Sequence, residues 1–157
     1  MRSTTRKEPP RPFEVRNSRI HGRGVFAIRE IPRGTRLIEY TGERISWQEA
    51  ERRYPEDPVP YHTFLFEVGT GEMCLDATRR GNASKWINHA CQPNCEAVED
   101  DDERMYIEAS RKIRRGEELT YDYNITLETR HTPAEKKKMP CLCGGRNCRG
   151  TILAKKR

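Results

Sequence analysis

The segment Lys85–Cys95 gathers more chemically versatile side chains than any other stretch of this chain. Asn88 and His89 bring hydrogen-bond donors and acceptors that could hold a polar ligand, and Cys91 and Cys95 bring sulfur that could bind a metal. A proline and an asparagine between the two cysteines disfavour a helix and favour a turn. The end of this segment is therefore expected to be a fixed loop that presents these groups.

Three further cysteines near the C-terminus, Cys141, Cys143 and Cys148, predict a metal site. Zinc takes four ligands in a tetrahedron, so one more ligand is needed. The spacing leaves this fourth ligand open among Cys74, Cys91 and Cys95. Because the N-terminus has no signal-like apolar segment, the six cysteines favour metal binding in a reducing compartment over disulfides. A disulfide in the tail and free thiols are the alternatives.

Two other short stretches carry candidate site residues. Glu118–Tyr123 is typical of a strand that ends in two phenols, and the alternation predicts that Tyr121 and Tyr123 point to opposite faces. Gly22-Arg23-Gly24 follows a predicted strand. These glycines either form a tight turn or let a ligand approach the backbone closely.

In chain order, these stretches resemble the SET-domain protein lysine methyltransferases that carry a post-SET zinc segment. The similarity covers Phe13–Leu153, and four motifs carry it: Ile20-His21-Gly22-Arg23-Gly24-Val25-Phe26, Asn-His-x-Cys-x-Pro-Asn from Asn88, Gly-Glu-Glu-Leu-Thr-Tyr-Asp-Tyr from Gly116, and Cys-x-Cys-x4-Cys from Cys141. Each motif alone is moderate evidence, whereas four in the right order are strong. The resemblance implies methyl transfer from S-adenosylmethionine to a lysine side chain of a basic protein, such as a histone tail.

The same resemblance assigns roles to individual residues. Tyr123 corresponds to the family's catalytic tyrosine, and Tyr121 to a tyrosine or phenylalanine that lines the channel for the substrate lysine. A hydroxyl at Tyr121 takes up room beside the amine, which favours monomethylation. One structural zinc is implied, held by Cys91, Cys141, Cys143 and Cys148. The residues implied to bind S-adenosylmethionine are His21, Gly22, Arg23, Gly24, Phe64, Asn88, His89 and Leu142.

Phe64 departs from the family pattern. Many relatives have a tyrosine at this place, in the strand before the turn, and that tyrosine faces the cofactor or the channel. Tyr61 could replace it from a shifted register. The channel-facing residue is therefore expected to be either Phe64 or Tyr61. Cys95 is left without a role.

The predicted elements favour a mainly β fold, that is, a β-rich α+β protein. Short strands are expected at 13–16, 25–28, 61–68, 72–75, 105–109 and 118–121. The capping box Ser46-Trp47-Gln48-Glu49 predicts a short helix to about Tyr54, and residues 82–87 are expected to form one helical turn. The resemblance implies a SET-type arrangement of several short sheets with a threaded, knot-like C-terminal segment.

One pattern occurs twice. Arg29-x-Ile31-x-Arg33-Gly34 recurs 82 residues later as Arg111-x-Ile113-x-Arg115-Gly116. Each copy is typical of a strand, an Arg-Gly turn and a second strand, so two similar hairpins are expected. A common turn sequence without further meaning is the alternative.

Four parts of the chain are expected: a disordered basic arm at 1–12, a SET catalytic domain at 13–124, a linker at 125–139 and a post-SET zinc segment at 140–157. Only 34% of the residues are hydrophobic, so a structural metal would help the modest core. No apolar run is long enough for a membrane span. The chain is expected to be a monomer in the cytoplasm or a nucleus, its own or a host's, and not to be secreted by a classical signal peptide.

Charge is unevenly distributed along the chain. The formal net charge is +6, yet residues 13–129 hold 17 basic and 22 acidic residues, so the excess of positive charge belongs to the two tails. An acidic body suits a cationic substrate such as a lysine-rich peptide. The basic tails could contact nucleic acid, or they could be ordinary solvated charge.

Three other functions compete with methyl transfer. A SET-like module could hold lysine tails without turnover, which would predict weak cofactor binding. A zinc-stapled nucleic-acid binder would need a basic or aromatic recognition face, which an acidic body disfavours. A cysteine hydrolase built on Cys91 and His89 lacks an evident third group to orient the base.

Overall fold

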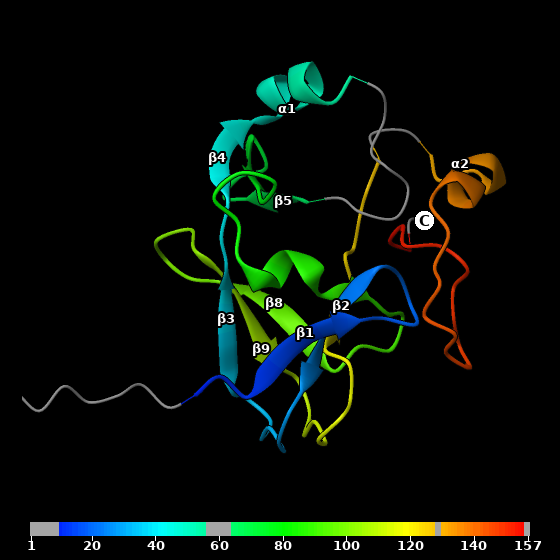
Figure 1. Ribbon diagram of the computed structural model, residues 1–157. Coiled ribbons are helices and arrows are strands. Elements are labelled where there is room, and N and C mark those ends of the chain that lie inside the picture. The colour runs from blue at the N-terminus through cyan, green and yellow to red at the C-terminus, as the bar shows by residue number, and fades with distance from the viewer. Residues whose placement is uncertain (1–9, 56–63, 128–129, 156–157) are drawn as a thin grey trace, which may run out of the picture.

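The computed structural model describes residues 10–55, 64–127 and 130–155. Within them the protein is mainly β, as predicted, and its strands form four small sheets (Figure 1). Two antiparallel sheets lie in the lower half of Figure 1. The first pairs β1 (Phe13–Asn17) with β2 (Arg23–Ala27), and the second has the strand order β3 (Arg36–Tyr40), β9 (Met105–Ala109), β8 (Cys95–Glu99).

The other two sheets complete the frame. A three-stranded antiparallel sheet has the order β4 (Glu43–Ser46), β6 (Met73–Asp76), β5 (Leu65–Val68). The smallest sheet pairs β7 (Asn88–His89) with β10 (Thr120–Tyr121) in parallel, over only two residues each. Tyr61, in the strand predicted for residues 61–68, lies outside the described residues.

The helices are short and capped by side chains. The predicted helix α1 (Trp47–Arg53) is confirmed with Ser46 as its N-cap, because the Glu49 N–H donates to Ser46 Oγ at 3.1 Å, while the Glu49 carboxylate accepts from Arg52 and Arg53. A 3₁₀ helix, η1 (Ala83–Trp86), forms the predicted helical turn. A third helix, α2 (Pro133–Lys138), lies within the segment expected to be a linker. None of the described helices is long and apolar enough to cross a membrane.

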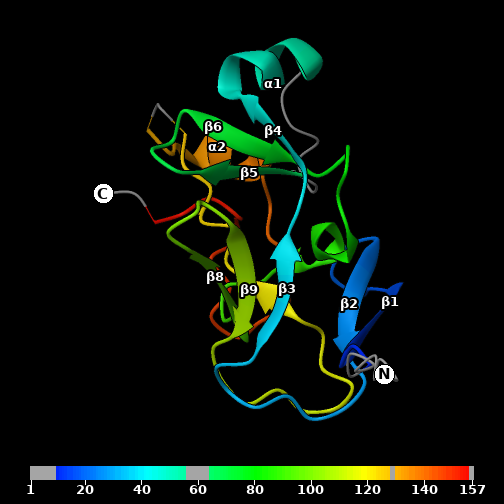
Figure 2. The ribbon, with the colours of Figure 1, turned by 90° about the vertical axis from the view of Figure 1, so that its left-hand side faces the viewer.

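The two copies of the repeated Arg-Gly pattern do not form separate hairpins, which corrects the prediction. Instead they pair with each other: the Ile31 N–H donates to Ile113 O at 2.8 Å, and the Ile113 N–H donates back to Ile31 O at 2.9 Å. Figure 2 shows the two segments, in blue-cyan and yellow, running side by side at the bottom of the molecule. We call residues 29–37 and 111–119 the paired repeats.

The paired repeats are related by a local two-fold axis. Gly34 donates to Ala109 O and Gly116 donates to Ala27 O, each at 2.8 Å. Ala27 in turn donates to Glu117 O, and Ala109 donates to Thr35 O, each at 2.9 Å. Each of these bonds thus has an equivalent 82 residues away. The symmetry lies in hydrogen bonds between the copies, so neither copy forms a hairpin of its own.

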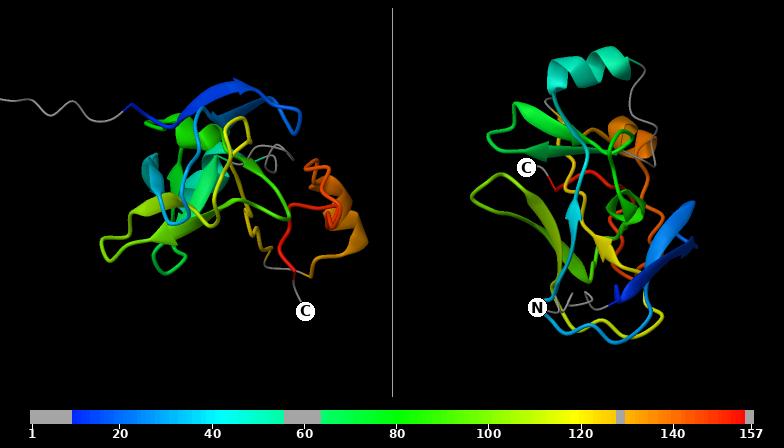
Figure 3. Two further views of the ribbon diagram at one scale, coloured as in Figure 1. Left: turned by 90° about the horizontal axis from the view of Figure 1, so that it is seen from below. Right: turned by 60° about the vertical axis from the view of Figure 1, so that its left-hand side comes forward.

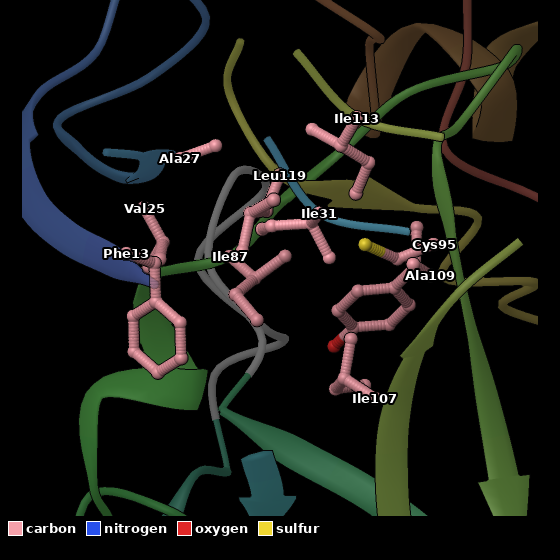
Figure 4. Close-up of a cluster of buried hydrophobic side chains, with 11 residues drawn as sticks. Phe13, Val25, Ala27, Ile31, Ile87, Cys95, Ile107, Ala109, Ile113 and Leu119 are labelled. Atoms are coloured by element: carbon pink, nitrogen blue, oxygen red, sulfur yellow. The ribbon is translucent and has the colours of Figure 1, made fainter. Parts of the chain in front are cut away.

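The glycines of the paired repeats are required by backbone geometry. Gly34 has φ +85° and Gly116 has φ +90°, a region that other residues rarely adopt. The isoleucines at the axis are buried in the largest hydrophobic cluster, which also includes Leu119, Ile107 and Ile87 (Figure 4). The paired repeats therefore form the base on which the main core is packed.

The C-terminal segment lies apart from this base. Figures 1 and 3 show α2 and the C-terminal residues on the side of the molecule opposite the hairpin of β8 and β9. Two isolated bridges fasten this segment, one between Ile125 and Leu153 and one between Pro140 and Thr151. Around them Met139, Ile152 and Leu153 form a separate small core.

The local symmetry predicts equal effects of equivalent core substitutions. Ile31→Val and Ile113→Val should each lower the free energy of unfolding by about 0.5–1.5 kcal/mol, because each removes one methyl group from the same core. Ile28→Val, at a side chain that is partly exposed, should change it by less. Urea unfolding followed by circular dichroism measures all three. A cost at Ile31 several times that at Ile113 would show that the two sites are not energetically equivalent.

Candidate functional site

Asn88 fixes the loop between β1 and β2 and the start of β2, where four of the predicted cofactor-binding residues lie, His21 to Gly24. Its amide nitrogen donates to the backbone oxygens of His21 at 3.1 Å and Arg23 at 3.0 Å. It also lies 3.1 Å from Ser18 Oγ and 2.8 Å from Glu118 Oε1. The side chain is buried in the smallest sheet, so one amide joins that sheet to the loop.

A side chain would be unfavourable at both Gly22 and Gly24. Gly22 has a positive φ of 44°. At Gly24, a Cβ atom would collide with the carboxylate of Glu118. That carboxylate accepts from Ser18 Oγ at 2.8 and 2.9 Å as well as from Asn88. The Gly-x-Gly pattern is thus more than a tight turn, because it brings backbone close to a partly buried negative charge.

His89 positions the predicted catalytic tyrosine. Its Nδ1 accepts a hydrogen bond from the Tyr123 N–H at 3.0 Å. Burial lowers the pKa of His89 to about 4. The nearby Asp122 carboxylate raises this pKa, and the Arg149 guanidinium lowers it. The imidazole is therefore neutral at pH 7, and its proton is on Nε2, which faces Cys91 Sγ at 3.6 Å.

Tyr121 and Tyr123 lie side by side, which corrects the prediction that they point to opposite faces. Their ring centroids are 4.9 Å apart. The alternation fails because β10 ends at Tyr121, so Tyr123 is no longer in a strand. The Tyr123 hydroxyl donates to Ile87 O at 2.6 Å, and burial together with the Glu118 carboxylate raises its pKa well above the usual value. Tyr123 therefore stays protonated.

An aromatic cluster continues from these two tyrosines. Phe66 lies 6.0 Å from Tyr121 and 4.8 Å from Tyr40, measured between ring centroids. Phe64 packs edge-on against Trp86 at 5.6 Å. The part made of Tyr40, Phe66, Tyr121 and Tyr123 could surround the aliphatic part of a long side chain, whereas Phe64 and Trp86 lie against the ammonium of Lys85.

The four cysteines singled out by the family resemblance come together. The sulfur atoms of Cys91, Cys141, Cys143 and Cys148 all lie within 4.8 Å of one another. The separation is 3.6 Å between Cys91 and Cys141 and 4.0 Å between Cys91 and Cys148. The two remaining cysteines, Cys74 and Cys95, are buried in the hydrophobic clusters instead.

Arg149 connects the cysteine cluster to the tyrosines. Its backbone N–H donates to Cys91 Sγ at 3.3 Å, while its guanidinium donates to both carboxylate oxygens of Asp122 at 2.6 and 3.1 Å. Asp122 lies between Tyr121 and Tyr123 in the chain, and its carboxylate is 3.5 Å from His89 Nδ1. The C-terminal tail is thereby attached directly to the segment that holds both phenols.

Sequence reasoning missed several of these residues. Tyr40, Asp122, Arg149 and Glu118 were given no individual role, although Asp122 and Glu118 lie inside a recognised motif. Leu142 is half-exposed between two of the clustered cysteines, and no described contact gives it a function. The arginine directly after Cys148 was a usable signal, because a cation beside several thiolates lowers their electrostatic cost.

Comparison with known proteins identifies the family. The SET domain model matches residues 22–124. The chain is 42% identical over 136 residues to "Histone-lysine N-methyltransferase trr" of Drosophila melanogaster, which covers 84% of this chain and 5% of that protein. It is 40% identical over 142 residues to "Histone-lysine N-methyltransferase, H3 lysine-4 specific" of Schizosaccharomyces pombe, covering 86% and 14% respectively.

A third relative, "Histone-lysine N-methyltransferase trithorax" of Drosophila virilis, is 39% identical over 141 residues, covering 86% of this chain and 3% of that protein. The chain thus spans only a small part of the length of these relatives. The matched region includes the β1–β2 loop from Gly22, the Asn88-His89 pair and both tyrosines. The chain belongs to the SET domain family.

Proposed function

We propose that this chain is a protein-lysine N-methyltransferase that uses S-adenosylmethionine. The observation that carries the proposal is the convergence of three separate segments on one place. The β1–β2 loop, the Asn88-His89 pair and Tyr123 are directly hydrogen-bonded to one another through two side chains, Asn88 and His89. S-adenosylmethionine would supply an electrophilic methyl group on a sulfonium centre.

The residues around the loop suit such a ligand. His21, Gly22, Arg23 and Gly24 would lie against it, and Asn88 keeps their backbone fixed. The remaining predicted contacts come from Phe64, His89 and Leu142. The Glu118 carboxylate adds a negative potential near the loop, which favours a cationic ligand.

The chain's main task is then to position and desolvate the substrate amine. A lysine amine with a pKa of about 10.4 must lose its proton at pH 7, which costs roughly 4–5 kcal/mol. An apolar channel lowers that pKa because it disfavours the charged form. Tyr123 and Tyr121 would line this channel, with Tyr40 and Phe66 behind them. Tyr123 remains a neutral phenol held by Ile87 O, so it positions the reacting groups without acting as a base.

The cysteine cluster has the dimensions of a zinc site. In a tetrahedron with zinc–sulfur bonds of about 2.3 Å, neighbouring sulfurs are about 3.8 Å apart. The observed separations of 3.6 and 4.0 Å lie on either side of that value. Backbone N–H groups of Arg149 and Gly150 donate to sulfur, as expected around thiolates. Four thiolates would leave no open position, so this zinc would be structural and would fix the tail.

We propose a basic protein as the substrate, and a histone tail as the first candidate. Relatives are named for histone-lysine methylation, and one is named for lysine 4 of histone H3. Outside the paired repeats, residues 13–129 hold 10 basic and 19 acidic residues, and this excess of negative charge favours a cationic tail. A histone substrate would put the protein in a nucleus, one of the two expected compartments.

Replacing Tyr123 by Phe tests the catalytic role. Loss of the hydroxyl should lower kcat by about 10²-fold, because one preorganised donor in a dry site is removed. The measurement is methyl transfer from labelled S-adenosylmethionine to an H3 N-terminal peptide and to mixed core histones. A second peptide with lysine 4 of histone H3 replaced by arginine reports the target residue.

The control is Tyr106→Phe, a half-buried tyrosine of β9 whose ring lies against Arg36. Wild-type activity that Tyr106→Phe retains and Tyr123→Phe loses supports the enzyme. Tight cofactor binding by calorimetry without transfer to histones would redirect the search to another protein substrate. Lysine-peptide binding without cofactor binding or turnover would replace this proposal by the reader function.

Tyr121→Phe tests the product state. The Tyr121 ring is buried against Tyr123, so its hydroxyl restricts the room around the amine. Wild type should stop at monomethyl-lysine, whereas Tyr121→Phe should produce more dimethyl- and trimethyl-lysine. Mass spectrometry of the product peptide over time measures both. An unchanged product distribution would contradict a restricting role for this hydroxyl.

Zinc content tests the proposed metal site. Purified protein should contain one zinc per chain, and Cys141→Ser should lose it, because three thiolates bind zinc more weakly than four. Cys74→Ala, at a buried cysteine outside the cluster, is the matched control and should keep the metal. Zinc is measured by elemental analysis, and the reactivity of the thiols towards a colorimetric reagent gives an independent readout. Equal zinc in both variants would remove Cys141 from the ligand set.

A further inference from the structure

The base of the molecule carries a dense group of exposed cations. They come from the two turns of the paired repeats, and we call them the arginine face: Arg29, Arg33, Arg36, Arg111, Lys112, Arg114 and Arg115. Residues 29–36 and 111–117 contain these seven basic residues and only two acidic ones, Glu30 and Glu117. The body was expected to be acidic in net charge, and this face is a local exception to that net charge.

The fold, and not the sequence alone, creates this face. The two basic turns are 82 residues apart in the chain, but the mutual hydrogen bonds of Ile31 and Ile113 hold them next to each other. Figures 1 and 2 both show the two turns together at the lower end, far from α1. Because the isoleucines point into the core, the charged residues around them are left at the surface.

Much of this charge is not neutralised within the protein. Arg36 pairs with Glu108, and Arg111 pairs with Glu117. Lys112 reaches Glu30 only at 4.0 Å. In the described parts of the chain, the side chains of Arg33, Arg114 and Arg115 have no ion pair. These three guanidiniums are therefore available to an external anion.

Within the described residues, the two turn glycines of the face have open space around them. An added Cβ at either turn glycine, Gly34 or Gly116, would meet nothing within 4 Å. The described chain also begins here, since the Arg29 guanidinium donates to Pro10 O at 2.8 Å. Three further basic residues precede that point in the sequence: Arg2, Arg6 and Lys7.

We propose that the arginine face binds the phosphodiester backbone of a nucleic-acid duplex. Guanidinium groups bind phosphate with two parallel hydrogen bonds and remain charged at any physiological pH. The face has a local two-fold axis that makes Arg33 and Arg115 equivalent, and a duplex presents two backbones related by two-fold axes. The inference does not depend on methyl transfer, because the face lies on surface turns outside the site.

The test uses two variants of the full chain with the same net charge. Arg33→Gln/Arg115→Gln removes the equivalent pair from the face. Arg52→Gln/Arg79→Gln removes two exposed arginines from α1 and the loop after β6. The probes are a labelled DNA duplex and an RNA duplex of the same sequence, and fluorescence anisotropy measures binding between about 50 and 200 mM salt.

Wild type and the Arg52/Arg79 variant should bind DNA equally, with the same salt dependence. The Arg33/Arg115 variant should bind roughly tenfold more weakly or worse, and its slope of log K against log salt should be less steep by about 1.8. Both variants should melt at the wild-type temperature, since all four side chains are exposed. Binding of DNA or RNA with this pattern supports the proposal, and the preferred probe identifies the source of the phosphates.

Equal losses in the two variants would overturn the proposal, because binding would then follow total charge. Absence of duplex binding by wild type would overturn it as well. Polyglutamate serves as a competitor at the same concentration of negative charge. If it displaces the probe better than unlabelled duplex does, the face is a docking surface for an acidic protein instead.

Discussion

Buried asparagine amides hold this structure together where its sheets are too short to do so. The pair of β7 and β10 has only two residues in each strand, so few backbone hydrogen bonds support it. Asn94 compensates: its Oδ1 accepts from the Thr120 N–H at 2.9 Å, and its Nδ2 donates to Glu118 O at 2.8 Å. Asn88 fastens the β1–β2 loop, and Asn82 donates to Glu39 O at the edge of β3. Backbone groups that a longer sheet would satisfy are satisfied here by side chains.

This arrangement explains why one short stretch can organise a site. Residues 82–94 reach three segments that are distant in sequence, and each of these contacts is made by a side-chain amide. An amide presents its donor and its acceptor on two separate atoms in one plane, whereas a hydroxyl presents both on a single rotating oxygen, so the amide fixes the register of its target more precisely. Loss of such a group in the interior leaves the partner's backbone unpaired, which costs about 1–3 kcal/mol. The loop can therefore be rigid without being part of an extended sheet.

The sequence predicted the local elements well where their signals are local. The N-terminal cap of α1, the turn at 82–87 and the three clustered cysteines of the tail were readable from residue types and spacing, whereas the fourth cysteine, Cys91, was chosen by the family resemblance. It failed where the deciding contacts are distant. The opposite-face prediction for the two tyrosines assumed that the strand continues, but Asp122 turns away to meet Arg149, a residue of the tail. The repeated Arg-Gly turns were recognised, but their mutual pairing depends on the whole intervening chain. Threading of the C-terminal segment and the exact bounds of the four parts stay predictions.

The paired repeats are symmetric, but the candidate site is built from the strands that flank them. The two copies make equivalent hydrogen bonds around the axis. The strands on either side of each copy, however, have different positions and different neighbours. β2 continues into the loop that Asn88 fixes, whereas its equivalent, β9, is the central strand of a three-stranded sheet. From the other ends of the repeats, β3 runs towards Tyr40 and the aromatic cluster, and β10 runs towards Tyr121 and Tyr123. The symmetric base contributes stability because it buries two equivalent isoleucines, Ile31 and Ile113. The strands next to the base are not symmetric, and they bring different side chains to one site. A substitution at the axis should therefore act on stability, and one beyond the repeats should act on the site.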